Sequence, residues 1–226
     1  LSTDAAVADV NGDGLVDIVV ANDGTSNMIY LGQPAPSRGD FSGVTGLPFG
    51  SANGPTVDVE VGDIDGDGAP DIAAANDGTP NVIYWGQPIN FGDTPSYASL
   101  PADAPVAGTS GSNPWPWSTI GPHAEQSSSI ALGDLDNDGD LDIVVGNGGG
   151  DPSRVHLNPA PSSASPRDDL RDTAGTPLVD SAGKETTDVA IAGGTDPETG
   201  APLDINMDGI PDIVLAVDGG HNLIYY

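Results

Sequence analysis

Cysteine is absent from this sequence of 226 residues, which excludes disulfide bonds and thiolate metal sites. Positive charge is scarce as well: 5 Lys and Arg residues stand against 34 Asp and Glu residues, for a formal net charge of −29. Nucleic acids and anionic membranes are bound through Lys and Arg, so both are disfavoured as partners. No apolar run approaches the ~20 residues of a membrane span, and no signal peptide is visible. We therefore expect no nucleic-acid binding and no membrane insertion.

Helical periodicity is also missing, because no stretch repeats its apolar residues at the spacing of an amphipathic helix. Glycine and proline are abundant instead, with 32 and 21 residues. That composition is typical of many short strands joined by turns. The sequence therefore predicts an all-β protein.

The acidic segment 63–71, Asp-Ile-Asp-Gly-Asp-Gly-Ala-Pro-Asp, is the most informative stretch of the chain. It places carboxylates at positions 1, 3, 5 and 9 and glycine at position 6. Ca²⁺ prefers six to eight oxygen ligands. Alternate acidic side chains in a tight loop can turn toward one point, a backbone carbonyl at position 7 can add an oxygen, and glycine permits the sharp turn. We interpret this segment as a calcium loop.

The same pattern occurs four times, at residues 9–17, 63–71, 134–142 and 204–212, which we call acidic loops 1 to 4. About four Ca²⁺ ions, one per repeat, are therefore expected. The predicted ligands, counting the carbonyl at position 7, are Asp9, Asn11, Asp13, Leu15 and Asp17; Asp63, Asp65, Asp67, Ala69 and Asp71; Asp134, Asp136, Asp138, Asp140 and Asp142; and Asp204, Asn206, Asp208, Ile210 and Asp212. An EF-hand would need a Glu at position 12 and flanking helices. Position 12 is Val20, Ala74, Val145 and Leu215, so these loops are expected to join strands.

Each acidic loop belongs to a longer repeat that reads as strand, loop, strand, Gly-rich turn and strand. In the second repeat the strands are predicted at 56–61, 72–75 and 81–85; candidates for a fourth strand in the repeats are 41–49, 97–100 and 177–180. We expect one domain over residues 1–226, with repeat units at about 1–50, 51–100, 127–180 and 186–226 and loop inserts at 101–126, 159–185 and 193–202.

Repeated sheets of three or four antiparallel strands describe a β-propeller. The four recognisable repeats would form a small closed propeller or part of a larger one. A β-sandwich with decorated loops is the alternative, which fourfold repetition disfavours.

The repeats resemble the VCBS and FG-GAP repeats of integrin-α-like β-propellers. The acidic loops carry the likeness, which extends over all four units and so over most of the chain. The resemblance implies calcium ligation from positions 1, 3, 5 and 9 and from the carbonyl at position 7. Phe49-Gly50 and Phe91-Gly92 are offset from the strands that they precede in the integrin form. VCBS repeats are thus the better match, and integrin ligand specificity is not carried over.

One insert contains two tryptophans among prolines, Trp115 and Trp117. Such side chains stack on sugar rings or on a partner protein, so both are candidate ligand-binding residues. The alternative is that they cover the edge of a sheet.

No catalytic motif is recognisable, and we predict that the protein is not an enzyme. The preferred function is a calcium-stabilised extracellular binding or adhesion module, secreted or at the cell surface, for a glycan or an extracellular protein. One alternative is a protomer of an extracellular filament or surface assembly that joins through open blade edges. A second is a polysaccharide-degrading enzyme of propeller fold.

Overall fold

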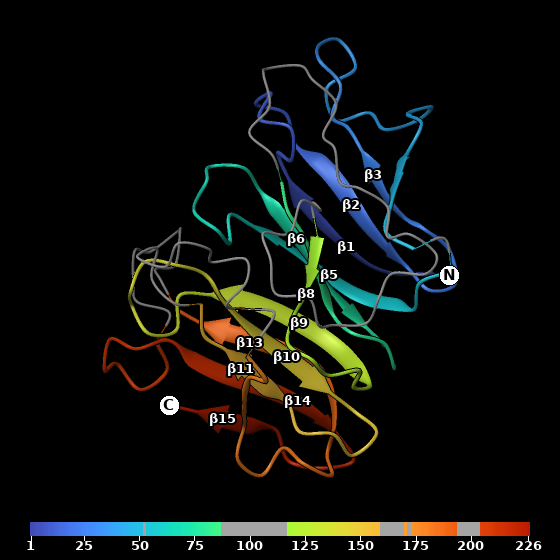
Figure 1. Ribbon diagram of the computed structural model, residues 1–226. Coiled ribbons are helices and arrows are strands. Elements are labelled where there is room, and N and C mark those ends of the chain that lie inside the picture. The colour runs from blue at the N-terminus through green and yellow to red at the C-terminus, as the bar shows by residue number, and fades with distance from the viewer. Residues whose placement is uncertain (52, 87–116, 159–169, 171–172, 194–203) are drawn as a thin grey trace.

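The computed structural model describes residues 1–51, 53–86, 117–158, 170, 173–193 and 204–226, and these form four antiparallel sheets (Figure 1). Each sheet uses consecutive segments of the chain, and its strands pair in chain order. We call the sheets blades 1 to 4. The expected all-β class, with repeated sheets of three or four strands as in β-propeller blades, is confirmed. No helix in the described part of the chain is long and apolar enough to cross a bilayer.

The strand bounds are as follows. Blade 1 contains β1 (Ser2–Ala8), β2 (Asp17–Asn22), β3 (Asn27–Tyr30) and β4 (Leu47–Phe49). Blade 2 contains β5 (Thr56–Gly62), β6 (Asp71–Asn76), β7 (Val82–Tyr84) and β8 (Trp117–Thr119). Blade 3 contains β9 (Ser127–Gly133), β10 (Asp142–Asn147), β11 (Arg154–His156) and β12 (Thr176–Pro177). Blade 4 contains β13 (Glu185–Ala192), β14 (Asp212–Asp218) and β15 (Leu223–Tyr225).

The second strand of each blade forms the centre of its sheet. Every residue of β6 and of β10 is buried, because neighbouring blades cover both faces of these strands. Small side chains such as Ala73 and Ala75 let the adjacent sheets approach closely. A continuous apolar run of this kind is what a strand buried on both faces requires.

Three hydrophobic cores lie between successive blades. The first joins blades 1 and 2 and includes Phe49, whose ring meets Tyr84 edge to face at a centroid distance of 5.2 Å. The second joins blades 2 and 3 around Trp85 and Ile143, and the third joins blades 3 and 4 around Leu215. The core is therefore distributed over the blade interfaces.

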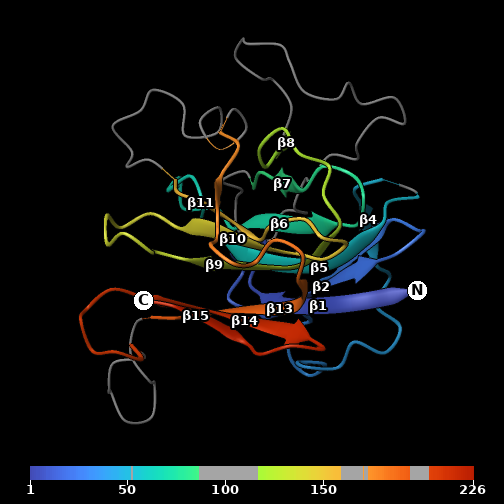
Figure 2. The same ribbon diagram turned by 90° about the horizontal axis from the view of Figure 1, so that it is seen from below.

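The blades follow one another around an arc whose inner side carries the first strand of each blade (Figure 2). β1, β5, β9 and β13 together line one cleft of about 410 Å³. In the part of the chain that the structure describes, extensive packing joins only successive blades. The four blades thus form an open arc rather than a closed ring. Of the two arrangements that the sequence allowed, the small closed propeller is therefore wrong.

The outermost strands differ most from expectation. β4 lies within the predicted segment 41–49, and β12 overlaps the predicted segment 177–180 at Pro177. The candidate 97–100 lies outside the described residues. In blade 2 the fourth strand is instead β8, within the range 101–126 that was assigned to an insert, because three backbone pairs with β7 fix it there.

Candidate metal centres

Acidic loops 1, 2 and 3 each connect the first strand of a blade to its second strand, and acidic loop 4 leads directly into β14. The sharp turn depends on two left-handed positions in every loop. The position-6 glycines Gly14, Gly68, Gly139 and Gly209 have φ values of 80°, 89°, 98° and 87°. Position 4 is also left-handed, at Gly12, Gly66, Asn137 and Met207, with φ between 58° and 70°. Sequence reasoning missed position 4, although the glycine there in two loops was a visible signal.

Within each acidic loop, backbone N–H groups donate hydrogen bonds to the carboxylates and keep them directed toward the inside of the loop. In acidic loop 1 the Asp9 carboxylate accepts from the N–H of Asp13 at 3.0 Å and from the N–H of Gly14 at 2.7 Å. Asp13 accepts in turn from the N–H of Leu15 at 2.8 Å. The corresponding bond from the glycine to position 1 recurs in acidic loops 2, 3 and 4. These hydrogen bonds therefore direct the carboxylates toward a common point without the help of an ion.

Two loops bring three carboxylates together. Oxygens of Asp63, Asp65 and Asp71 lie within 4.8 Å of one another, as do oxygens of Asp134, Asp136 and Asp138. This donor set of hard oxygens suits a cation such as Ca²⁺, because mutually repelling charges are neutralised when they share one ion. The residues present thus fit the metal that the sequence predicts.

Acidic loops 1 and 4 have asparagine at position 3. Its side-chain amide donates a hydrogen bond to the carboxylate at position 5 and so offsets part of the negative charge there. The Nδ2 of Asn11 donates to Asp13 at 3.1 Å, and the Nδ2 of Asn206 donates to Asp208 at 3.1 Å. Calcium affinity rises with the number of charged ligands. We therefore expect acidic loops 2 and 3 to bind more tightly than acidic loops 1 and 4.

The aspartate at position 9 has a structural role that the sequence did not reveal. Asp71 is fully buried, and its two oxygens accept from the N–H of Ile64 at 2.8 Å and of Gly86 at 2.7 Å. It thereby ties its own loop to the end of the third strand. A Cβ at Gly86 would collide with the carbonyl oxygen of Pro70, so glycine is needed where this approach occurs. The recurring Gly-Gln after the third strand was the available signal.

The other loops repeat this tie. Asp17 accepts from the N–H of Val10 and of Gly32, and Asp142 accepts from the N–H of Leu135 and of Asn158, all at 2.7–2.9 Å. Asp212 accepts from Ile205 at 2.6 Å, and its Oδ1 is buried with no hydrogen-bond partner among the described residues.

Burial raises the pKa of these position-9 carboxyls. The pKa of Asp71 rises to about 7 and that of Asp142 to about 6, while the backbone donors oppose the shift. Burial also raises the pKa of Asp17. A charged carboxylate in these positions is costly until a cation shares it. Protons and a divalent cation therefore compete for the same groups near neutral pH.

A second group of acidic side chains lies in the cleft along the inner strands. Asp4, Asp58, Glu60 and Asp188 all line it. Burial, followed by the neighbouring Asp4 carboxyl, raises the pKa of Asp58 to about 7, and burial raises the pKa of Glu60. Asp58 nevertheless accepts from the N–H of Ile130 at 2.8 Å, so it also links blade 2 to blade 3.

The raised pKa of Asp58 predicts a pH dependence of stability. The pKa of its carboxyl has the ordinary value of 3.8 in the unfolded chain and is about 7 in the fold, so the fold favours the protonated form. The corresponding stabilisation is complete below pH ~4 and is lost as the pH rises to about 7. Asp58→Asn mimics the protonated group. We expect this variant to melt a few degrees above the parent at pH ~8, and by clearly less at pH ~5, in thermal unfolding with chelator.

Asp218→Asn is the matched control, since Asp218 lies exposed at the end of β14. If Asp58→Asn and Asp218→Asn change the melting temperature equally at both pH values, the assignment to Asp58 is wrong.

Of the two tryptophans, Trp117 is described and lies in β8, opposite Tyr84 of β7. It is half-buried and packs against the core between blades 1 and 2. Trp115 lies outside the described residues. A ligand-binding role for either stays a prediction.

The fold and these loops define a class: an all-β protein of propeller-type blades with an acidic turn before the second strand of each blade. In blades 2 and 3 this turn brings together three carboxylates that could hold a metal ion. The FG-GAP-like repeat matches residues 9–74 and 63–145 and so spans acidic loops 1, 2 and 3. The protein belongs to the FG-GAP-like repeat family.

No curated protein matches the chain. Solved structures that are similar to it include BBS1N in complex with ARL6DN, soaked with lead in one crystal and with mercury in another. Sequence identity is 16% for both, and TM-scores are 0.48 and 0.49. The matches cover 97% of this chain but only 52% and 53% of those chains, so the protein spans about half the length of these neighbours.

Proposed function

We propose that the protein is a calcium-stabilised, extracellular β-propeller module that binds a glycan or a protein partner. The observation that carries the proposal is the convergence of three carboxylates in each of two equivalent loops, at the same place in successive blades. Binding ions there couples metal occupancy to the folded arrangement of the blades. Millimolar calcium is typical of extracellular fluid, where modules with modest calcium affinity are filled.

The residues that would hold the ions are the four loop sets named above. When bound, calcium neutralises carboxylates and keeps them ionised. The chain itself orients these groups through N–H donors at positions 5, 6 and 7. Isothermal titration of the chelated protein with Ca²⁺ is expected to show about four sites in two affinity groups, because two loops carry asparagine at position 3.

A cleft in blade 1 supports the binding role. It measures about 410 Å³ and is lined largely by polar residues: Leu31, Gln33, Ser37, Asp40, Ser42, Gly43, Val44, Thr45 and Leu47. Polar side chains of this kind suit a ligand rich in hydroxyl groups. Arg38, in the same segment, lies beside acidic loop 1, with its Nη2 3.4 Å from the carbonyl oxygen of Gly14. The cleft and the metal loop are therefore adjacent, and ligand binding is expected to depend on calcium.

A glycan array probed with the labelled protein tests this proposal. We expect binding in calcium, loss of binding in chelator, and loss of binding in Thr45→Arg, because the new side chain would fill the exposed cleft. Thr25→Arg is the matched control, since Thr25 is equally exposed on the turn between β2 and β3 of the same blade. Equal binding by both variants would place the ligand elsewhere, and turnover of a bound glycan would favour the alternative of a polysaccharide-degrading enzyme.

A further inference from the structure

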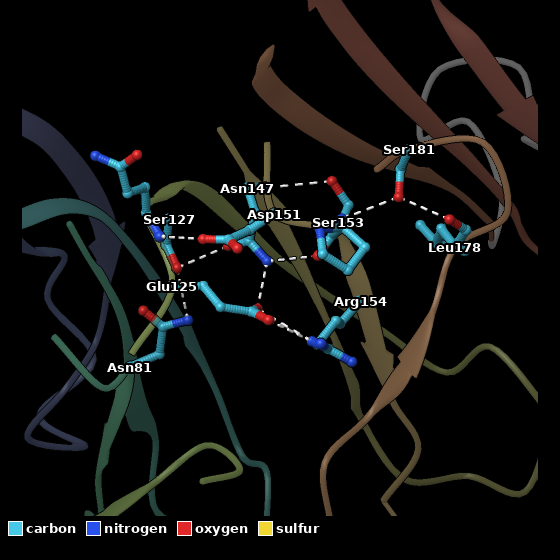
Figure 3. A network of polar contacts seen from close by, with 11 residues as sticks. Asn81, Glu125, Ser127, Asn147, Asp151, Ser153, Arg154, Leu178 and Ser181 are labelled. Atoms are coloured by element: carbon cyan, nitrogen blue, oxygen red, sulfur yellow. Dashed lines mark hydrogen bonds and ion pairs between the residues drawn. The ribbon is translucent and has the colours of Figure 1, made fainter. Parts of the chain in front are cut away.

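A polar bridge recurs at every interface between blades. It runs from the residue at, or directly before, the start of the third strand of one blade to a hydroxyl near the start of the next blade. Asn27 donates to Thr56 at 3.1 Å, Asn81 donates to Ser127 at 2.9 Å, and the hydroxyls of Ser153 and Thr186 lie 3.0 Å apart. Figure 3 shows the bridge between blades 2 and 3, where Ser127 also donates to Asn147 at 2.9 Å. All these side chains are buried.

A second bridge recurs along the inner strands. A polar side chain just after the β-bulge of one blade accepts from a backbone N–H of the following blade. Asp4 accepts from Val59 at 3.3 Å, Asp58 accepts from Ile130 at 2.8 Å, and Ser129 accepts from Val189 at 3.2 Å. The bridging residues occupy equivalent positions, because the register shift precedes each of them in its own sheet.

An apolar contact completes each interface. Val61, Leu132 and Ile191 hold equivalent positions on the inner strands, each opposite an isoleucine of the second strand. Each packs into the core shared with the preceding blade. The equivalent residue of blade 1 is Val7, opposite Ile18, and its side chain is 69% exposed.

The two ends of the arc carry matching halves of these contacts. Blade 4 presents Asn222, which accepts from the N–H of Val217 at 3.1 Å as Asn27 and Asn81 do from their own second strands. It also presents Asp188, the equivalent of Asp4 and Asp58. Blade 1 presents Ser2, the equivalent of Thr56 and Ser127: its hydroxyl donates to Asn22 at 2.8 Å, as theirs do to Asn76 and Asn147.

We propose that two copies of this chain associate head to tail, with the outer face of blade 4 of one copy packed on the outer face of blade 1 of the other. Asn222 then bridges to Ser2, Asp188 accepts from the N–H of Ala5, and Val7 enters an apolar interface. This inference goes beyond the proposed function and does not depend on which ligand the module binds.

The occupant is a second copy because both halves of every contact are present in one sequence. The new interface repeats the three that the chain already forms, including small residues on the face that meets the next blade: Ala216 of blade 4 corresponds to Ala21 and Ala75. A head-to-tail contact closes into a ring if the rotation allows it and otherwise extends into a filament. Either product uses the same two faces.

Sedimentation velocity and light scattering of the calcium-loaded protein test this inference. At physiological ionic strength, where the charge of −29 is screened, we expect a species of at least twice the chain mass of 22.6 kDa that dissociates on dilution. A monomer at every concentration would overturn the proposal, whether or not the protein binds a glycan.

Two variants test whether the outer faces of blades 1 and 4 form the contact between copies. Val7→Glu is expected to weaken association at least ~10-fold, because it places an unpaired charge in the interface. Asn222→Asp keeps the acceptor for Val217 but removes the donor for Ser2, and it is expected to weaken association as well. Val179→Glu is the matched control, since Val179 is 74% exposed on the loop after β12, the last strand of blade 3.

Association by Val7→Glu at the strength of the parent, or equal weakening by Val7→Glu and Val179→Glu, would contradict the assignment. Unchanged thermal unfolding of Val7→Glu in dilute solution verifies that its blade remains folded.

Discussion

Removing calcium is expected to lower the melting temperature by ~10 °C or more. A ligand present at about 100 times its dissociation constant adds about 2.7 kcal/mol per site to the free energy of unfolding. Two filled sites would therefore add about 5 kcal/mol, and each kcal/mol shifts the melting temperature of a chain of this size by about 2–4 °C. The physical reason is that converging carboxylates repel one another in the folded state until an ion neutralises them.

Differential scanning calorimetry in excess chelator, followed by return of Ca²⁺, measures this effect. The melting temperature is expected to recover fully with Ca²⁺ and only weakly with Mg²⁺, because Mg²⁺ is smaller and demands octahedral geometry. An unchanged melting curve in chelator would rule out a stabilising role for calcium in these loops.

Asp71→Ala is expected to destabilise the protein whether or not calcium is present. It leaves the N–H groups of Ile64 and Gly86 without an acceptor in a buried site. Two unsatisfied buried donors and the lost volume cost about 3–5 kcal/mol, equivalent to ~10 °C. The loss is expected in chelator as well as in calcium, since the tie is made by the chain itself.

Asp67→Ala is the matched comparison in the same loop. Asp67 is exposed and accepts from the N–H of Ala69 at 2.9 Å, where water can replace it. Its loss is expected to reduce the gain in melting temperature that calcium produces and to leave the chelated protein unchanged. If both variants behave alike in chelator, the separate structural role of Asp71 is wrong.

The acidic loops illustrate what can be predicted from local sequence. Each spans nine residues, so its turn, its inward carboxylates and its glycine at position 6 are dictated by neighbours in the chain. The strands around it were predictable for the same reason: the segments 56–61, 72–75 and 81–85 correspond to β5, β6 and β7. Short-range periodicity and turn chemistry are sufficient there.

Contacts between distant segments were not predictable in this way. The link from Asp71 to Gly86 joins the start of β6 to the segment after β7, 15 positions away, and the bridge from Asp58 to Ile130 joins blades whose residues are 72 positions apart. Neither aspartate could be assigned its partner from the sequence, because an aspartate on a strand is equally consistent with exposure to solvent. The strand β8 was missed because a long, Pro-rich segment separates it from the strand that it pairs with.

The amino-acid sequence by itself therefore determined the repeat, the all-β class and the identity of the candidate calcium ligands, since these depend on residues close together in the chain. Only the tertiary structure decided that the four blades form an open arc, that the ninth aspartate of each loop is buried in the blade, and that the two ends carry complementary contacts. Those properties arise where separate sheets pack on one another, and such packing depends on the register and facing of strands that local patterns do not specify.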